Sequence, residues 1–481
     1  MTNHTTDTTT AVEGTTARLA SWLSGFRGDQ APAEVIERAK LLILDGLGCA
    51  LVGAQLPWSR TAVEAVTGFE GRGDVPIIGW GRTAGGPAAA VLNSTFIQGF
   101  ELDDFHPLAP LHSASLILPA LLSSAHEDSS VDGARFLSAA IAGFEVGPRV
   151  GLALHGAQML SRGWHSGPVF GSIAAAAAVA NLLGLNATAT EDALGLGATQ
   201  AGGLMAAQFG AASKRMQHGF AARNGLYAAL LARSGYTGIK AVFEQPYGGF
   251  LSTFGEGHDP DATQIDSELG ERWETQRIAI KPYAAMGGLH AAIDEVFDIS
   301  ADRPLAISEI EAIEVELGHA VYQHGWWPPQ RPLTPTAAQM NVAYSVAVAV
   351  LDGAALIDQY SPARIDADDV WQLLPRITAH HQSDFDAQPL GRGQTRVRVR
   401  FTDGQVLESY QFAAKSILHP LDFEAVVSKY ETLTRRVIDP DRQQEIKDAV
   451  LALDTAPDLT HLVGLLVDPV ASPFEADSGG T

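Results

Sequence analysis

Apolar residues recur at helical spacing through the first half of this chain. From about Ala17 to Gly257, segments such as PAEVIERAKLLILDGLGCALVG and LHSASLILPALLSSAHE end at Gly, Pro, Ser, Asn or Asp residues, which is typical of consecutive helices joined by short turns. GSIAAAAAVANLLGL and GFAARNGLYAALLARSG are rich in alanine. We expect these two segments to be buried, because small side chains let helices pack at short distance.

The pattern changes near Trp273. RIAIKPY indicates a strand that ends at Lys281, and AISEIEAIEVELG indicates further strand and helix. In QTRVRVRFTDGQVLESY, apolar and polar residues alternate on both sides of Asp403 and Gly404, which predicts a β-hairpin. Helical spacing returns after Pro420.

These segments predict a mostly α protein with two domains. We expect residues 16–272 and 413–470 to form one helical domain from both ends of the chain, with residues 273–412 inserted as a smaller α+β domain. Residues 1–15 and 471–481 are expected to be flexible tails. A cleft between two domains is a natural place for a ligand.

The charge of the chain restricts its partners. It contains 32 Lys and Arg against 55 Asp and Glu, a formal net charge of −23 at pH 7. This charge repels phosphate, which argues against a nucleic-acid or acidic-membrane partner. An anionic substrate would therefore need a few cations gathered in one pocket.

The only cysteine, Cys49, lies in the apolar run LLILDGLGCALVG. One cysteine excludes an internal disulfide and a cysteine-based zinc or iron–sulfur site, and a buried thiol favours a cytoplasmic location. The first residues resemble neither a secretory signal nor a transit peptide. The sequence contains no window of about 18 uninterrupted apolar residues, so we expect no transmembrane span.

The segment ELDDFHPLAPLHSAS places Glu101, Asp103, Asp104, His106 and His112 between two apolar helices. Imidazole and carboxylate groups are common metal ligands, but this spacing matches neither an HExxH motif nor a facial triad. A helix-end cap with solvated histidines is a second interpretation. We favour a third, a substrate site in which a histidine acts as an acid and carboxylates orient it.

Three further polar clusters interrupt apolar sequence. His165 and Ser166 precede a long alanine-rich helix, whose free N–H groups could bind an anion; a cap or core histidine is the ordinary alternative. Lys281 stands where we place the domain boundary. It is either a surface lysine or one that reaches into the cleft.

The last cluster, ASKRMQHGFAARNG, contains Lys214, Arg215, His218 and Arg223. If a helix begins near Ser213, Lys214 and His218 share one face. The alternative is a solvated basic face, although the flanking sequence is apolar. The sequence has no GxGxxG after a strand, no P-loop and no GxSxG, so we expect no nucleotide or flavin cofactor.

Seven segments, taken in order, resemble the MmgE/PrpD family over nearly the whole chain. They are LLILDGLGCALVG, ELDDFHPLAPLHSAS, GWHSGPVFGS, TQAGGLMAAQFGAASKRMQHGFAARNG, SGYTG with YGGF, IKPYAAMGGLHAAID, and TPTAAQMNVAYSVAVAV. The resemblance implies that the α+β domain is a lid, that the active site lies between the domains, and that the protein is a homodimer without a required metal or other cofactor.

The resemblance also implies roles for individual residues. The catalytic positions are His112, His165, Lys214, Lys281, Asp103 and Asp104, and the substrate-binding positions are Glu101, Met205 and Tyr344. We add His218 to the substrate-binding positions from its place in the cluster with Lys214. The implied substrate is a small polycarboxylate, and the first expectation is decarboxylation of cis-aconitate to itaconate. A dehydratase acting on 2-methylcitrate or citrate is the alternative, and an inactive polycarboxylate-binding dimer is a third.

Overall fold

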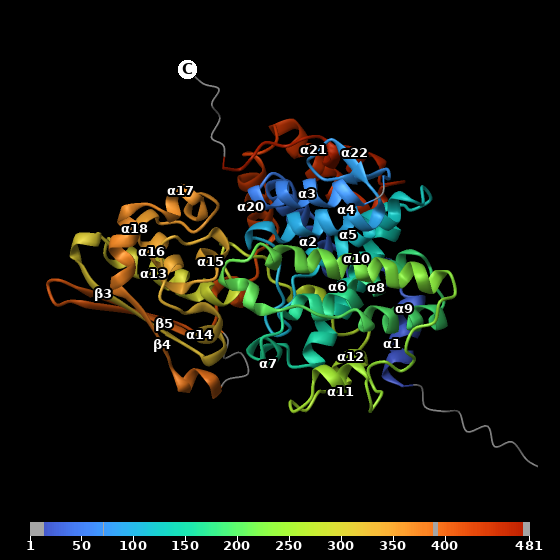
Figure 1. The fold of residues 1–481 in the computed structure, drawn as a ribbon, viewed down its shortest axis with the longest axis horizontal. Coiled ribbons are helices and arrows are strands. Elements are labelled where there is room, and N and C mark those ends of the chain that lie inside the picture. The colour runs from blue at the N-terminus through green and yellow to red at the C-terminus, as the bar shows by residue number, and fades with distance from the viewer. Residues whose placement is uncertain (1–13, 71, 388–392, 475–481) are drawn as a thin grey trace, which may run out of the picture.

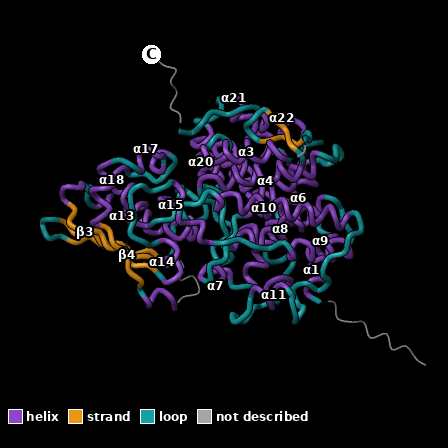
Figure 2. The backbone as a smooth tube through the Cα atoms, viewed as in Figure 1, coloured by secondary structure: helices purple, strands orange, loops and turns teal. Residues whose placement is uncertain are grey.

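The computed structural model describes residues 14–70, 72–387 and 393–474. It has a larger, helical part and a smaller part that contains a β-sheet, and the two lie side by side (Figure 1). Helices dominate both parts, and the strands gather mainly in the smaller one (Figure 2). The prediction of a mostly α protein is confirmed.

The larger part is built from both ends of the described chain. Its elements are α1 (Thr15–Gly25), α2 (Ala33–Gly53), α3 (Pro57–Phe69), β1 (Val75–Ile77), β2 (Arg82–Ala84), α4 (Gly86–Ile97), α5 (Ser113–His126), α6 (Gly133–Ala153), α7 (Gly156–Ser161), α8 (Ser166–Leu182), α9 (Ala187–Thr199), α10 (Ser213–Arg233), α11 (Phe250–Phe254), α12 (Thr263–Asp266), α20 (Phe423–Thr434), α21 (Pro440–Leu451) and α22 (Thr460–Val467). The C-terminal helices α20 and α21 pack against α2, and α22 lies against β1, so the C-terminal helices share a layer with α2, α3 and α4 (Figure 1).

The centre of the larger part is α8, which packs against α5, α6, α9 and α10. Every residue of α8 is buried, as expected from its alanine content. Small residues allow the close approach: a Cβ added at Gly225 of α10 would lie 2.4 Å from the Ala175 Cβ of α8. Helix α10 begins at Ser213, where the sequence predicts it.

The smaller part contains α13 (His290–Asp302), β3 (Ile310–Leu317), α14 (His319–Gly325), α15 (Pro335–Gln339), α16 (Val342–Asp352), α17 (Pro362–Ile365), α18 (Asp368–Leu373), β4 (Ile377–His381), β5 (Thr395–Phe401), β6 (Val406–Gln411) and α19 (Lys415–Leu418). Its sheet has the strand order β4-β3-β5-β6. β3 and β4 are parallel, whereas β5 pairs antiparallel with both β3 and β6. Helices α13 and α16 pack on this sheet, and the predicted hairpin is the β5–β6 pair.

Two expectations differ from the structure. The strand expected to end at Lys281 is absent from the described residues: Ala279 forms only an isolated bridge with Phe105, because no further residue of either segment continues the pairing. The Phe474 ring packs against Phe100, with centroids 5.5 Å apart, so residues 471–474 belong to the folded part and not to a tail. The division at residues 273 and 412 stays a prediction, and residues 1–13 and 475–481 lie outside the described residues.

Helix α6 is long and apolar enough to cross a membrane by length and composition alone. In the structure, 94% of that window is buried inside the protein. This burial is typical of a central core helix. Cys49 of α2 is buried as well.

Candidate active site

A cavity of about 130 Å³ lies between the two parts. The larger part lines it with Glu101, Phe105, Pro107, Leu108, Pro110, His112, Leu160, His165, Ser166, Met205 and Lys214. The opposite wall consists of Lys281, Met286, Gly287, Gly288, Ala291, Ala320, Val321, His324, Met340, Gly393, Ala413, Ala414 and Ile417. The described polar side chains are therefore concentrated on the wall of the larger part and at Lys281, and the wall of the smaller part is mainly apolar.

Glu101 forms the floor of this cavity. It follows the 3₁₀ helix η2 (Gln98–Phe100) and has left-handed backbone angles, with φ 55° and ψ 32°. This conformation is unfavourable for a residue with a Cβ, and such strain persists where the surroundings fix it. The turn directs the Glu101 carboxylate toward three cations.

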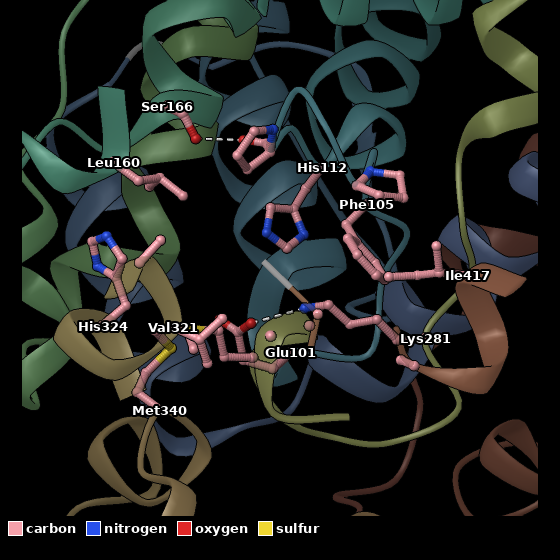
Figure 3. Close-up of a pocket in the computed structure, with 18 of the residues that line it drawn as sticks. Glu101, Phe105, His112, Leu160, Ser166, Lys281, Val321, His324, Met340 and Ile417 are labelled. Carbon is pink, nitrogen blue, oxygen red and sulfur yellow. Dashed lines mark hydrogen bonds and ion pairs between the residues drawn. The ribbon is translucent and has the colours of Figure 1, made fainter. Parts of the chain in front are cut away.

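Lys214, Arg215 and Lys281 all pair with Glu101. The Lys214 ammonium and the Arg215 guanidinium contact Oε1, and Lys281 Nζ lies 2.8 Å from Oε2 (Figure 3). Burial works to raise the pKa of Glu101, but the three cations outweigh it and hold that pKa well below its usual range. Three cations around one carboxylate leave positive charge for an anionic ligand.

Lys214 holds its proton less firmly than an exposed lysine does. Burial lowers the pKa of Lys214 to about 8, against the opposing effect of Glu101. Arg215 is fully buried and also donates to Gln339 Oε1 at 2.7 Å. Gln339 in turn donates to the carbonyl oxygens of Phe100 and Ala284. This amide connects the larger part to the smaller one directly behind the site.

His112 stands at the N-terminal end of α5 and points into the cavity toward Glu101 and Lys281 (Figure 3). Its Nδ1 lies 3.2 Å from Oδ2 of the buried Asp103. A carboxylate at Nδ1 orients the ring and stabilises the imidazolium. The other nitrogen, Nε2, is then available to a ligand in the cavity.

Asp104 has a structural position. Its carboxyl accepts hydrogen bonds from the backbone N–H groups of Ser113 (2.8 Å) and Ala114 (2.9 Å) at the start of α5. Burial, and then the neighbouring Asp103, raises the pKa of Asp104 to about 8. The residue caps the helix that carries His112, and it is not among the described residues that line the cavity.

His218 lies between the two cavity histidines. Its ring centroid is 5.2 Å from that of His112 and 5.0 Å from that of His165. The Ser115 hydroxyl donates to His112 O, so its oxygen accepts from His218 Nδ1 at 2.8 Å. His165 Nδ1 donates to Gln217 Oε1 at 2.8 Å.

Burial keeps His165 and His218 neutral at physiological pH. It lowers the pKa of His165 to about 3, and Lys214 adds to the effect. It also holds the pKa of His218 well below its usual range. His165 can therefore offer a neutral imidazole to a ligand. His218 acts behind it as a support for both rings.

Several predicted residues have other surroundings. Tyr344 is not among the described residues that line the cavity; it is buried, and its hydroxyl donates to the Gln359 carbonyl at 2.5 Å. The arrangement thus gives no support to its predicted substrate contact, because α16 turns this side chain into the core of the smaller part. His106 contacts Glu274 Oε2 at 3.1 Å and is buried, so the solvated-histidine interpretation is wrong for it. Met205 does line the cavity.

Gln339, Arg215 and His324 were not among the predicted site residues. Arg215 belongs to the cation cluster seen in the sequence, but helix spacing alone could not show that it turns toward Glu101. Gln339 lies in the family segment TPTAAQMNVAYSVAVAV, but no role was predicted for it there, and His324 stands in no predicted polar cluster. No group of three or more His, Cys, Asp or Glu side chains with metal-ligand geometry is found within residues 14–70, 72–387 and 393–474.

The chain is similar to known proteins over nearly its whole length. The chain matches the MmgE/PrpD N-terminal domain at residues 17–263 and the MmgE/PrpD C-terminal domain at residues 283–455. It is 45% identical to the cis-aconitate decarboxylase-like protein oryM of Aspergillus oryzae, over 94% of this chain and 97% of that protein. It is 42% identical to the cis-aconitate decarboxylase of Aspergillus terreus, over 96% and 98%, and 24% identical to human cis-aconitate decarboxylase, over 96% of each. The chain therefore belongs to the MmgE/PrpD family.

Proposed function

We propose that this protein decarboxylates cis-aconitate to itaconate and CO2 without a cofactor. The observation that carries the proposal is the group of buried cations around one cavity. It occurs in a chain 42% identical, over nearly its whole length, to a protein named cis-aconitate decarboxylase. A tricarboxylate needs such a local excess of positive charge in a protein whose net charge is −23.

The charge changes of the reaction fit the residues in the cavity. When CO2 leaves the methylene arm of cis-aconitate, the electron pair of the broken bond forms an exocyclic double bond. The former double bond shifts its electrons to the vinylic carbon, which is α to a carboxylate. Positioned cations stabilise this extended enolate more than the ground state, and Lys214 and Lys281 supply that charge.

One proton completes the product. The carbanionic carbon takes it from an acid, and the resulting dianion is itaconate. His112 is suited to this step, because its ring lines the cavity and its Nδ1 lies 3.2 Å from the Asp103 carboxylate, which can orient the ring. His165 has a lowered pKa and is neutral, and its Nδ1 already donates to Gln217. Its Nε2 could donate to a retained carboxylate only if the proton moved from Nδ1 to Nε2. We therefore assign the proton to His112.

The substrate test is proton NMR of the purified protein with cis-aconitate, citrate, 2-methylcitrate and iminodisuccinate supplied separately. The expected result is the appearance of itaconate vinyl signals, with one CO2 released per turnover, from cis-aconitate alone. Hydration of cis-aconitate or dehydration of 2-methylcitrate without CO2 would replace the proposal with the dehydratase. Binding without turnover of any of the four would indicate an inactive polycarboxylate-binding protein.

Independence from a cofactor is tested separately. Activity is expected to survive dialysis against EDTA, because the described side chains offer no group of metal ligands and the sequence has no nucleotide motif. Loss of activity that one divalent metal restores would contradict this part of the proposal. The buried Cys49 as the only cysteine supports a reducing, cytoplasmic location, which cell fractionation tests.

We also propose a homodimer, formed through the outer face of α10. Phe220, Tyr227 and Leu231 are 41%, 42% and 40% exposed, and their spacing puts them on one stripe of this helix. Tyr227→Glu with Leu231→Glu is expected to shift the mass measured by light scattering from dimer to monomer. Phe69→Glu is the control, since Phe69 is 75% exposed on α3. A monomeric wild type would contradict the proposal.

A further inference from the structure

A buried lysine–carboxylate pair lies behind the cavity and takes no part in the proposed chemistry. Lys429 Nζ of α20 is 2.6 Å from Asp45 Oδ1 of α2, and the two side chains are 8% and 1% exposed. Neither residue is among the described ones that line the cavity. A buried ion pair seldom stabilises a fold more than apolar residues of similar volume would. Stability alone therefore does not explain why Lys429 and Asp45 are buried here.

Lys429 also contacts the turn that carries the site carboxylates. Its Nζ donates a hydrogen bond of 2.5 Å to the Leu102 carbonyl oxygen. Leu102 stands between Glu101, which pairs with Lys214 and Lys281, and Asp103, which contacts His112. One ammonium group thus holds the backbone midway between the two carboxylates on which the cations and the acid depend.

The backbone of the turn at Glu101 and Leu102 is held by a hydrogen-bond donor from outside the turn. Glu101 has a left-handed φ of 55°, a conformation that a non-glycine residue keeps only where its surroundings fix it. Fixing the carbonyl of the next residue restricts the same turn. The hydrogen bond from Lys429 is placed to do this, and it comes from a helix more than 300 residues further along the chain.

The charge of Lys429 has a second effect. Asp45, Asp103 and Asp104 are all buried, and their mutual repulsion would disfavour the ionised form of each. Burial works against the ammonium, but Asp45 more than offsets it, so the pKa of Lys429 is raised and the group stays charged. Lys429 thus places a fixed positive charge among these carboxylates, and Asp103 contributes to holding that charge there.

We propose that Lys429, held by Asp45, is a positioning residue for the active site. It fixes the Leu102 carbonyl, and through it the Glu101 and Asp103 carboxylates that orient Lys281 and His112. The C-terminal helices therefore complete the site although none of their side chains line the cavity among the described residues. The choice of substrate rests on the proposed function, but the positioning role applies to any reaction of this site.

The main test is Lys429→Met in the full-length protein. We expect kcat to fall about 10- to 100-fold, since small displacements of catalytic groups have effects of this size. KM should change less than about threefold, because all cations of the cavity remain. Lys429→Arg, which keeps the charge and a donor, should retain a higher kcat than Lys429→Met.

Lys40→Met is the matched control. Lys40 is also a buried lysine of the α2–C-terminal contact, with its Nζ 3.0 Å from Asp454 Oδ1, but it does not touch the 101–104 turn. Its replacement should lower the thermal stability and leave kcat unchanged. An equal loss of kcat in Lys40→Met and Lys429→Met would reduce Lys429 to a structural role and overturn the inference.

A second variant covers a failure to fold. Asp45→Asn with Lys429→Met removes both charges, so no unpaired ion is left buried, and kcat should still fall. Hydrogen exchange of residues 101–104, measured by mass spectrometry, should be faster in either variant than in wild type. Unchanged kcat and unchanged exchange in a folded variant would refute the positioning role. Absence of CO2 release by the wild type would refute only the decarboxylase, because the exchange readout needs no substrate.

Discussion

His112 is the side chain on which the proposed reaction depends most, because it supplies the proton that completes itaconate. His112→Ala is expected to lower kcat by about 10²- to 10⁴-fold, the usual effect of removing a positioned acid. The fold should persist, since the side chain is partly exposed and its ion pair within the described residues is with Asp103. Steady-state kinetics with cis-aconitate and a thermal melt check both parts.

His126→Ala provides the control for this prediction. His126 stands at the other end of the same helix and has a similar contact, with its Nε2 3.7 Å from Asp74 Oδ1. It is far along α5 from the cavity, so kcat should not change. Near-normal turnover of His112→Ala would transfer the role of acid to His165.

We expect the activity to fall at alkaline pH because Lys214 loses its charge there. Burial lowers the pKa of its ammonium to about 8, so the group is charged below that pH and loses its charge as the pH rises through it. We expect kcat/KM to fall roughly tenfold between pH 7 and pH 9, in proportion to the protonated fraction. Lys214→Arg keeps its charge in this range and should give a flatter profile. The same midpoint in both proteins would show that another group titrates.

The residue types of the site could be predicted better than their contacts. The sequence places acids, histidines and lysines in four short clusters, and the structure brings Glu101, His112, His165, Lys214 and Lys281 to one cavity. The sequence could not predict that Glu101 forms ion pairs with three cations. Lys281 lies 180 residues away along the chain, and its approach to Glu101 depends on how the two parts pack. The same limit applies to Tyr344, whose side chain is not among those that line the cavity in the described residues. A motif fixes the identity of a residue, whereas the packing of α16 decides where its side chain points.

At the scale of secondary-structure elements, periodicity predicts what local contacts determine. The β5–β6 hairpin follows from alternation on both sides of a turn, and α8 follows from its alanine-rich sequence. The strand expected before Lys281 has the right composition, yet it finds only an isolated bridge to Phe105. Strand pairing needs a neighbour, and outside a hairpin the sequence pattern does not show whether one is available.

The contact between α8 and α10 makes a prediction at this scale. Gly225→Ala places a Cβ 2.4 Å from the Ala175 Cβ and 2.7 Å from the Ala176 nitrogen, so the two helices must separate. We expect a loss of about 1–3 kcal/mol in the free energy of unfolding, measured by denaturant titration. Gly68→Ala in α3 meets nothing within 4 Å and should be neutral or stabilising. Equal stability of Gly225→Ala and wild type would mean that α8 and α10 can separate without loss of stability.

At the scale of the whole molecule, the cavity exists because two parts meet. The larger part supplies most of the described charged groups and the smaller part supplies an apolar wall. The residues that join them are therefore as important for the site as those that line it. Gln339 is fully buried at this junction. It accepts from Arg215 and donates to one carbonyl of each part.

Gln339→Ala tests whether this junction supports the site. The substitution removes the acceptor of Arg215 Nη2 and the donor to the Phe100 and Ala284 carbonyls. Each buried group left unsatisfied costs about 1–3 kcal/mol, so the free energy of unfolding should fall markedly. KM for cis-aconitate should rise as well, because Arg215 also holds Glu101. In the control Gln359→Ala, the lost hydrogen bonds are the one accepted from the Leu356 N–H and the one donated to Asp352. Both lie within the smaller part, so stability alone should decrease. A rise in KM of the same size in both variants would show that the effect is not specific to the junction between the two parts.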